Sequence, residues 1–527
     1  MNVFHFWYQR LFQKKRQKQA TEFSLGKRPS NDSTQNPQVN KSGQKPTTPI
    51  PKSLQQVKDD LSKVLSLPEN KDIHLREYTV PDGKKCLLIF IEGLVDSELV
   101  NETVLAPLLL GSRMDIPFLA REDIADLQQA ITKLLEGAVI LFRDGIDQAI
   151  VLHAESVPTR SVEAPKTENV VRGPQEGFVE DVVVNKNLIR RVFPSPNLMV
   201  EEIYIGKLAP AKNYYLYLRG IANPKLVDEV RTRLLAITTD GALDAGEIEQ
   251  FIEDRPKSLV PTVLATERPD RAASFLRDGH VVILANRSPN ALVLPCTFWS
   301  MFHVSEDSFQ RAFYGSFIRI IRLISIFITL FAPGVFIAAT NYHPGMIPTD
   351  LLLAIAGSRE RLPFPSIFEV FLMEFSFELI REAGIRIPSA LGSTISIVGA
   401  LILGQAAVQA NIISPVIVIV VAITGLASFA IPNSSLGYMI RITRFFLIAF
   451  ASFFGLIGLT AGFCMILIYV AGIKSAGVPF FSPYVPHAEH NGDLILRNLV
   501  FKDKVRPASV RPLRALRVWW SREWDEQ

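Results

Sequence analysis

Residues 387–440 read IPSALGSTISIVGALILGQAAVQANIISPVIVIVVAITGLASFAIPNSSLGYMI and contain no Asp, Glu, Lys or Arg. An uncharged run of more than fifty residues is longer than a buried helix of a soluble protein needs. It suffices for two bilayer crossings of about 20 residues each. Two further uncharged runs, Leu323 to Tyr342 and Phe445 to Ile473, are each long enough for one crossing. The sequence therefore predicts a protein embedded in a membrane.

The chain before the first span has the mixed charge of a soluble protein, and the whole composition is a blend of the two parts. Of 527 residues, 48% are hydrophobic and 20% are charged, with a net charge of +4. Basic residues crowd both ends, which suits the cytoplasmic face of a membrane. No nucleic-acid recognition module accompanies them, so membrane lipids rather than nucleic acid are the expected partner.

Five regions follow from shifts in composition along the chain. Residues 1–52 form a basic tail and linker, which we expect to be disordered because its prolines and polar residues bury little apolar surface. The predicted regions after it are a first α/β subdomain (53–165), a connector with a second α/β subdomain (166–304), a transmembrane helical domain (305–480) and a basic cytoplasmic C-terminal tail (481–527).

The two α/β subdomains are predicted to be related because the same pattern occurs twice. Glu92 to Val100 aligns without gaps with Arg219 to Val227, and a pair of short apolar runs around a polar turn follows each. The second pair lies in Val281 to Phe302, which is apolar enough to pass for a membrane span. An arginine at mid-bilayer costs about 2.5–3.5 kcal/mol, so the turn at 286–290 favours a soluble hairpin.

The fold class is therefore a multi-domain membrane protein, with an N-terminal cytoplasmic α/β region followed by an α-helical transmembrane bundle. Arg311, Arg319 and Arg322 flank the first span, and basic residues follow the last one. The positive-inside rule places both flanks in the cytoplasm, which requires an even number of crossings. Four spans satisfy it, near 323–342, 389–409, 412–431 and 445–473.

A further helix at 364–383 carries Glu374, Glu378 and Glu382 on one narrow stripe, here called the acidic stripe. One interpretation is an amphipathic helix at the interface with its carboxylates in water. A second is that the stripe lines an aqueous path, where carboxylates from several subunits attract cations. A third is ion pairing with Arg381 or Arg386. If this helix crosses the bilayer, the even count fails.

No known catalytic motif occurs in a setting that could use it, so an enzyme is not expected. The eight histidines are scattered and fit surface or turn positions better than a metal site. The three cysteines lie far apart, and no cofactor is predicted. Glycines between 399 and 462 are interpreted as helix-packing positions.

Several strings together resemble one family. Residues 171–181, VRGPQEGFVED, are similar to the RGP-x-EGF signature of the A subunits of GerA-type spore germination receptors and their SpoVAF relatives. The strings HPGMIP at 343–348, REAG at 381–384 and SIVGALILGQAA at 396–407 resemble the same family. The signature residues are Arg172, Gly173, Pro174, Glu176, Gly177 and Phe178, which form either a structured connector or a subunit contact.

The resemblance implies an integral protein of the inner spore membrane. It would act beside a transporter-like B subunit, which senses the germinant, and a lipoprotein C subunit. Family members are thought to assemble through their A subunits into an oligomeric ion channel whose opening starts germination. A SpoVAF-like accessory channel and a non-conducting transducing or scaffold subunit are the alternatives.

Overall fold

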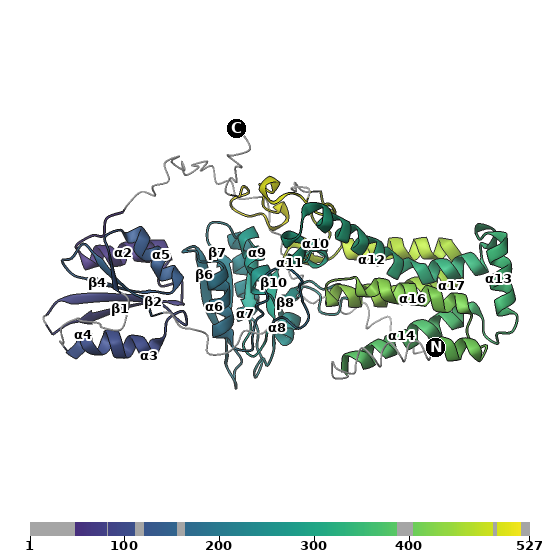
Figure 1. Cartoon of the computed structure of the whole chain (residues 1–527), viewed down its shortest axis with the longest axis horizontal. Coiled ribbons are helices and arrows are strands. Elements are labelled where there is room, and N and C mark those ends of the chain that lie inside the picture. Colours follow the sequence, from purple (N-terminus) through teal and green to yellow (C-terminus); the bar gives the residue numbers. More distant parts are fainter. Residues whose placement is uncertain are drawn as a thin grey trace, which may run out of the picture.

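The computed structural model describes residues 48–81, 83–110, 121–154, 164–386, 404–487 and 493–517. Three parts follow one another along the long axis of the molecule (Figure 1). The first α/β subdomain forms one end, the second lies in the middle, and a bundle of long helices forms the other end. Helix α13 (Thr349–Arg359) lies across the far end of this bundle.

The first subdomain is a five-stranded antiparallel sheet in the order β1-β2-β4-β5-β3, covered by helices on both faces. Its strands are β1 (Ile73–Thr79), β2 (Lys85–Ile91), β3 (Arg121–Ile124), β4 (Val139–Arg143) and β5 (Ala149–Leu152). Its helices are α2 (Leu54–Leu65), α3 (Ser97–Val100), η2 (Asn101–Leu105), α4 (Ala106–Leu110) and α5 (Leu127–Glu136). The strand β2 alternates its buried side chains between the two faces, so both layers of helices are needed to cover it.

The second subdomain repeats this sheet in the order β6-β7-β9-β10-β8. Its strands are β6 (Leu198–Ile205), β7 (Ala211–Leu218), β8 (Leu264–Thr266), β9 (Val281–Leu284) and β10 (Ala291–Leu294). Helices α6 (Val182–Val192) and α9 (Pro269–Asp278) cover one face, and α7 (Pro224–Leu235) and α8 (Ala245–Ile252) cover the other. The two subdomains therefore have the same strand order, as the repeated sequence pattern predicts.

The predicted soluble hairpin is also confirmed. Strands β9 and β10 pair in an antiparallel register, with Val281 opposite Leu294, and the polar turn joins them. The apolar stretch 281–302 therefore builds the central strands of a sheet and then helix α10 (Phe298–Phe302), and it does not form a single long helix.

The first subdomain begins earlier than the predicted linker boundary. Ile50 is buried, and its backbone N–H donates to the carbonyl of Ala125 at 3.1 Å. Residues 48–52 therefore belong to the subdomain, and the predicted boundary at 52 needs correction. The rest of the predicted disordered tail lies outside the described residues.

The helical region contains two helices, among the described residues, that are long and apolar enough to cross a membrane by length and composition. These are α12 (Ala312–Asn341) and α17 (Ser434–Ala471); α14 (Ser366–Arg386) and the shorter α16 (Pro415–Phe429) pack beside them. The predicted span at 389–409 falls mostly on residues 387–403, which lie outside the described residues.

Helix α17 reverses direction at Gly455, which corrects the predicted single span at 445–473. Gly455 has φ +60° and ψ −140°, a conformation outside the helical range. A Cβ added at Gly458 would clash with the carbonyl oxygen of Phe450. Eight residues of continuous helix would separate these positions by about 12 Å, so the two arms must fold back on each other. Gly455 is a close-approach position, as predicted, because an added Cβ would lie 2.9 Å from Cγ of Tyr342, and its backbone also makes the reversal.

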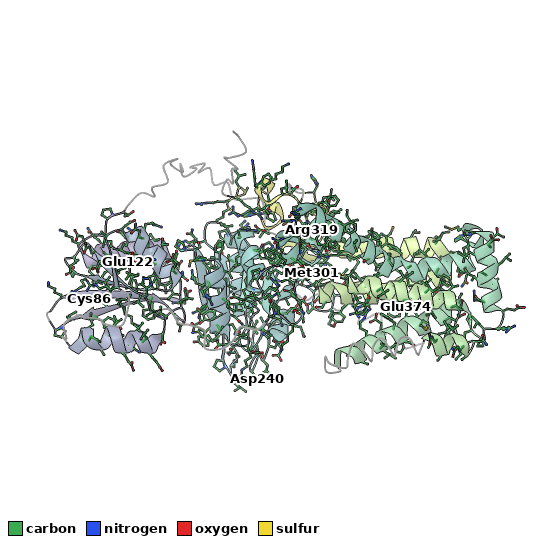
Figure 2. The ribbon with its side chains drawn as sticks, in the orientation of Figure 1. Cys86, Glu122, Asp240, Met301, Arg319 and Glu374 are labelled. Atoms are coloured by element: carbon green, nitrogen blue, oxygen red, sulfur yellow. The ribbon has the colours of Figure 1, made fainter. Side chains whose placement is uncertain are left out.

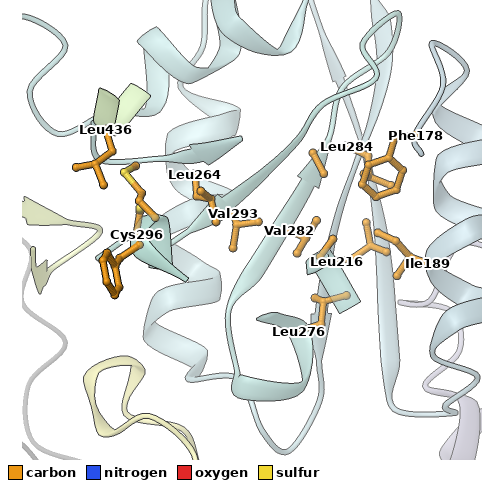
Figure 3. Close-up of a cluster of buried hydrophobic side chains, with 14 of the residues drawn as sticks. Phe178, Ile189, Leu216, Leu264, Leu276, Val282, Leu284, Val293, Cys296 and Leu436 are labelled. Atoms are coloured by element: carbon orange, nitrogen blue, oxygen red, sulfur yellow. The ribbon is translucent and has the colours of Figure 1, made fainter. Parts of the chain in front are cut away.

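Both arms of helix α17 meet the second subdomain. The first arm of α17 starts at the subdomain core, where Leu436 shares a cluster with Cys296 (Figure 3). The second arm returns to it, because the hydroxyl of Tyr469 donates to Ser258 at 2.9 Å. Phe480, beyond the last helix, is buried in the same cluster. The subdomain and the helices therefore share one continuous core.

We predict that a fragment of residues 48–304 folds without detergent, because helices cover both faces of each sheet. Far-ultraviolet circular dichroism should show mixed α/β structure and a cooperative thermal transition. The fragment should melt below one that also carries residues 472–486, since Phe480 is missing from its core. An aggregated product without a transition would contradict this prediction.

Candidate functional site

Buried charges inside the helical region form the most unusual feature of the molecule. Glu374 on α14 is fully buried within the bundle (Figure 2). Its carboxylate lies 2.8 Å from Nη2 of Arg444 on α17, which is also fully buried. Because charged side chains inside apolar helices are costly, such a pair is a candidate for function.

The second carboxylate of the stripe joins the same cluster. Glu378 lies 2.8 Å from Arg441, 3.0 Å from Arg444 and 3.6 Å from Arg381. The Arg381 guanidinium also sits over the rings of Phe377 and Phe429, at 5.0 and 4.7 Å from their centroids. Three arginines thus surround two glutamates, which leaves one excess positive charge.

The acidic stripe therefore has two kinds of environment in the single chain. Glu374 and Glu378 face arginines of α17 rather than open solvent, whereas Glu382, one turn further on, is exposed. An interfacial helix with all its carboxylates in water does not describe Glu374. The predicted pairing of Glu378 with Arg381 is present, but the two arginines of α17 are its nearer partners.

Several polar atoms of this cluster are incompletely paired. Within the described chain, Nε and Nη1 of Arg444, Nε of Arg381 and both carboxylate oxygens of Glu374 are buried without a well-directed hydrogen bond. The charges lie close together, but their geometry is poor. A network of this kind contributes less than its distances suggest.

Glu369, which sequence reasoning did not select, holds the outer end of α14. It is buried and accepts a hydrogen bond from the backbone N–H of Ser414 at 2.9 Å, with Arg359 at 3.9 Å. The hydroxyl of Ser366 donates to Asn341 at the end of α12, at 2.8 Å. These contacts fix the first turn of α14 independently of the arginines of α17.

The basic residues predicted to flank the membrane also lie in two environments: Arg319 and Arg322 pair with acidic residues, whereas Arg311 is exposed. Arg319 lies at the junction of the second subdomain and the helical region (Figure 2). Its guanidinium is 3.2 Å from Asp307 and 2.7 Å from Asp493, and Arg322 is 2.7 Å from Asp307. Arg311 is exposed. Burial raises the pKa of Asp307, but the hydrogen bond from Arg322 and the two positive charges outweigh it, so the pKa lies below its ordinary value.

Residues 493–517 do not form a free tail but pack against this junction. The guanidinium of Arg497 donates to the carbonyls of Gln310 and Ser308, and Arg506 donates to that of Arg277 at 2.9 Å. Burial and the charge of Arg319 lower the pKa of His303 to about 4, so its ring is neutral, and Nε2 lies 2.7 Å from the carbonyl of Leu494. His303 is half-buried and His280 is buried, and both lie in the turns that directly follow helices α10 and α9, which agrees with the predicted surface or turn positions.

The signature segment leads into helix α6, which joins the two subdomains. Asp181 caps this helix by accepting from the N–H groups of Val183 and Val184. Lys186 and Arg190, one turn apart and fully buried, pair with first-subdomain carboxylates: Lys186 with Glu92 at 3.0 Å and Arg190 with Asp72 at 2.7 Å.

The signature residues themselves lie in two environments. Gly177 and Phe178 are buried, and Gly173 has a φ of +134° and contacts the ring of Phe309. Arg172, Pro174 and Glu176 are exposed. Burial of Gly177 and Phe178 fits a structured connector and exposure of the other residues fits a subunit contact, so both alternatives stay predictions.

The sequence analysis identified the glutamates of the acidic stripe but not the arginines that pair with them. Arg441 and Arg444 fall in the gap between the predicted spans 412–431 and 445–473, although their spacing of three residues complements that of Glu374 and Glu378, which are four apart. That complementarity was the available signal. Nothing in the sequence pairs Asp72 with Arg190, which are 118 residues apart.

Comparisons with known proteins agree on one family. The profile of the Bacillus/Clostridium GerA spore germination proteins matches residues 59–509. Spore germination protein KA of Bacillus subtilis (strain 168) is 37% identical over 456 residues, which cover 84% of each chain. The uncharacterized membrane protein YfkQ of the same strain is 35% identical over 444 residues, covering 82% of this chain and 86% of that protein.

One solved structure is also similar. The crystal structure of the N-terminal domain of the A subunit of the Bacillus megaterium spore germinant receptor GerK3 is 23% identical. The superposition covers 48% of this chain and 99% of the GerK3 domain, with a TM-score of 0.38.

Proposed function

Because this chain belongs to the Bacillus/Clostridium GerA family of spore germination proteins, we propose that it is a germinant-receptor A subunit whose copies assemble into an ion channel in the inner spore membrane. Opening of the channel starts germination. The partners are a transporter-like B subunit and a lipoprotein C subunit. The observation that carries the channel role is the buried charged cluster of Glu374, Glu378 and Arg444 between two helices of the helical region.

The arrangement of the parts supports this proposal. Both ends of the helical region lie next to the second subdomain, so the α/β region and residues 493–517 occupy one side of the membrane. The basic flanks favour the cytoplasm for that side. A conducting path would then run along the helices toward α13, and the acidic stripe would supply carboxylates to it in the assembled channel.

Conductance in planar bilayers tests the channel role. Full-length protein, reconstituted with its partner subunits, should conduct cations when a germinant is added. We predict that Glu378→Gln and Glu382→Gln each lower the cation preference of the open channel several-fold, because a neutral isostere removes charge without changing volume. The reversal potential in a potassium chloride gradient measures this preference. Glu360→Gln, at the exposed end of α13, is the control and should leave the preference unchanged.

Two failures have different meanings. An assembled complex that never conducts would leave a transducing or scaffold role for this chain. A complex that conducts with unaltered selectivity in both variants would keep the channel but remove the acidic stripe from its wall.

A further inference from the structure

We propose that Glu374 and Glu378 of α14, with Arg441 and Arg444 of α17, form an ion-pair latch that holds the channel closed. This inference rests on the proposed channel function and adds its regulation. The latch joins two helices that are far apart in sequence, and its central pair is fully buried. Opening would separate α14 from the first arm of α17.

The latch acts on one half of α14 only. Ser366 and Glu369 fix the outer end of this helix to α12 and to the start of α16. The contacts of Glu374 and Glu378 lie about one and a half and two and a half turns beyond Glu369, toward the second subdomain. Because the outer end stays held, breaking the latch would let the inner half of α14 swing away from α17 while its first turn stays in place.

The charges explain why the latched state does not pass cations. Both carboxylates are engaged by arginines, and Arg381 adds a third positive charge beside Glu378. The cluster carries a net charge of about +1, which repels cations in a medium of low dielectric constant. Separation of the helices would free the two carboxylates, and the same residues would then attract cations.

Incomplete hydrogen bonding makes the latch breakable. A buried ion pair with unsatisfied donors recovers little of its desolvation cost, so water that entered between α14 and α17 would compensate for much of the lost pairing. A well-satisfied network would instead lock the helices permanently. The closed and open states can therefore lie close enough in free energy for a partner subunit to choose between them.

The first test replaces the latch by a reversible covalent link. Full-length protein with Cys464→Ser, Glu378→Cys and Arg441→Cys is reconstituted with its partner subunits and treated with a bifunctional methanethiosulfonate reagent. Cys86 and Cys296 are buried and can stay, because only the exposed Cys464 competes for the reagent. Before cross-linking we expect conductance without germinant at about ten times the wild-type level. Cross-linking should abolish conductance with or without germinant, and reduction should restore it.

The second test exchanges the charges. Arg444→Glu alone should raise germinant-independent conductance or prevent folding, whereas Arg444→Glu combined with Glu374→Arg should return it toward the wild-type level. In the cross-linking test, each single cysteine variant is treated with the same reagent as a control for modification of one helix alone. Fully cross-linked channels that still open with germinant, or a double exchange that leaks as much as Arg444→Glu, would overturn the latch. Wild-type protein that never conducts would instead refute the channel role.

Discussion

Replacing Gly455 by alanine should prevent the helical region from reaching its folded arrangement. The residue has φ +60° and ψ −140°, which is open almost only to glycine and costs a side-chain-bearing residue about 1–3 kcal/mol. An added Cβ would also lie 2.9 Å from Cγ of Tyr342. That ring cannot move freely, because its hydroxyl donates to the carbonyl of Ser452. The clash adds a further cost of about 1–3 kcal/mol.

The measurement is thermal stability of the full-length protein in detergent, followed by circular dichroism and size-exclusion chromatography. We expect Gly455→Ala to aggregate or to melt about 4–24 °C lower, because a loss of about 2–6 kcal/mol shifts the melting of a domain of roughly 150–250 residues by about 2–4 °C per kcal/mol. Gly357→Ala is the matched control, since an added Cβ there meets nothing within 4 Å. Equal melting of the two variants would mean that the reversal at Gly455 is absent.

The α/β half of the fold could be predicted because its signals are local. Alternating apolar residues and polar turns define each hairpin, and the repeated Gly93 and Gly220 both adopt positive φ values, of +81° and +77°, as equivalent turns should. The hairpin at 281–302 was assigned correctly because a local turn outweighed its hydropathy.

The helical half was harder to predict, because a hydropathy profile gives the length of an apolar run but not the direction of the chain within it. The run Phe445 to Ile473 is apolar throughout, so only the backbone of Gly455 reveals that the chain turns back. Helix α14 was set apart for its glutamates, but Arg441 and Arg444 allow it to pack inside the bundle. Charge compensation between distant residues is a tertiary property, and no window of sequence contains it.

The second large effect is expected where the two subdomains meet. Asp72 and Arg190 are fully buried and 2.7 Å apart, and the guanidinium also donates to the carbonyls of Ser195 and Leu198. Removing one partner leaves the other charge buried and alone, which costs about 3–5 kcal/mol. Asp72→Asn should therefore open the interface, where the backbone N–H of Lys71 donates to Val200.

Hydrogen exchange of the full-length protein measures this opening. The amides of Lys71 and Val200 should exchange at least about 100-fold faster in Asp72→Asn, since 1.4 kcal/mol corresponds to a factor of about ten. The double variant Asp72→Leu/Arg190→Leu should recover most of the protection, because apolar residues can replace a buried pair at little net cost. Lys52→Gln is the control, because its partner Asp147 is exposed and 4.0 Å away, where an ion pair contributes at most about 1 kcal/mol. Unchanged exchange in Asp72→Asn would show that other contacts, such as the pair of Lys186 with Glu92, and not this pair, hold the subdomains together.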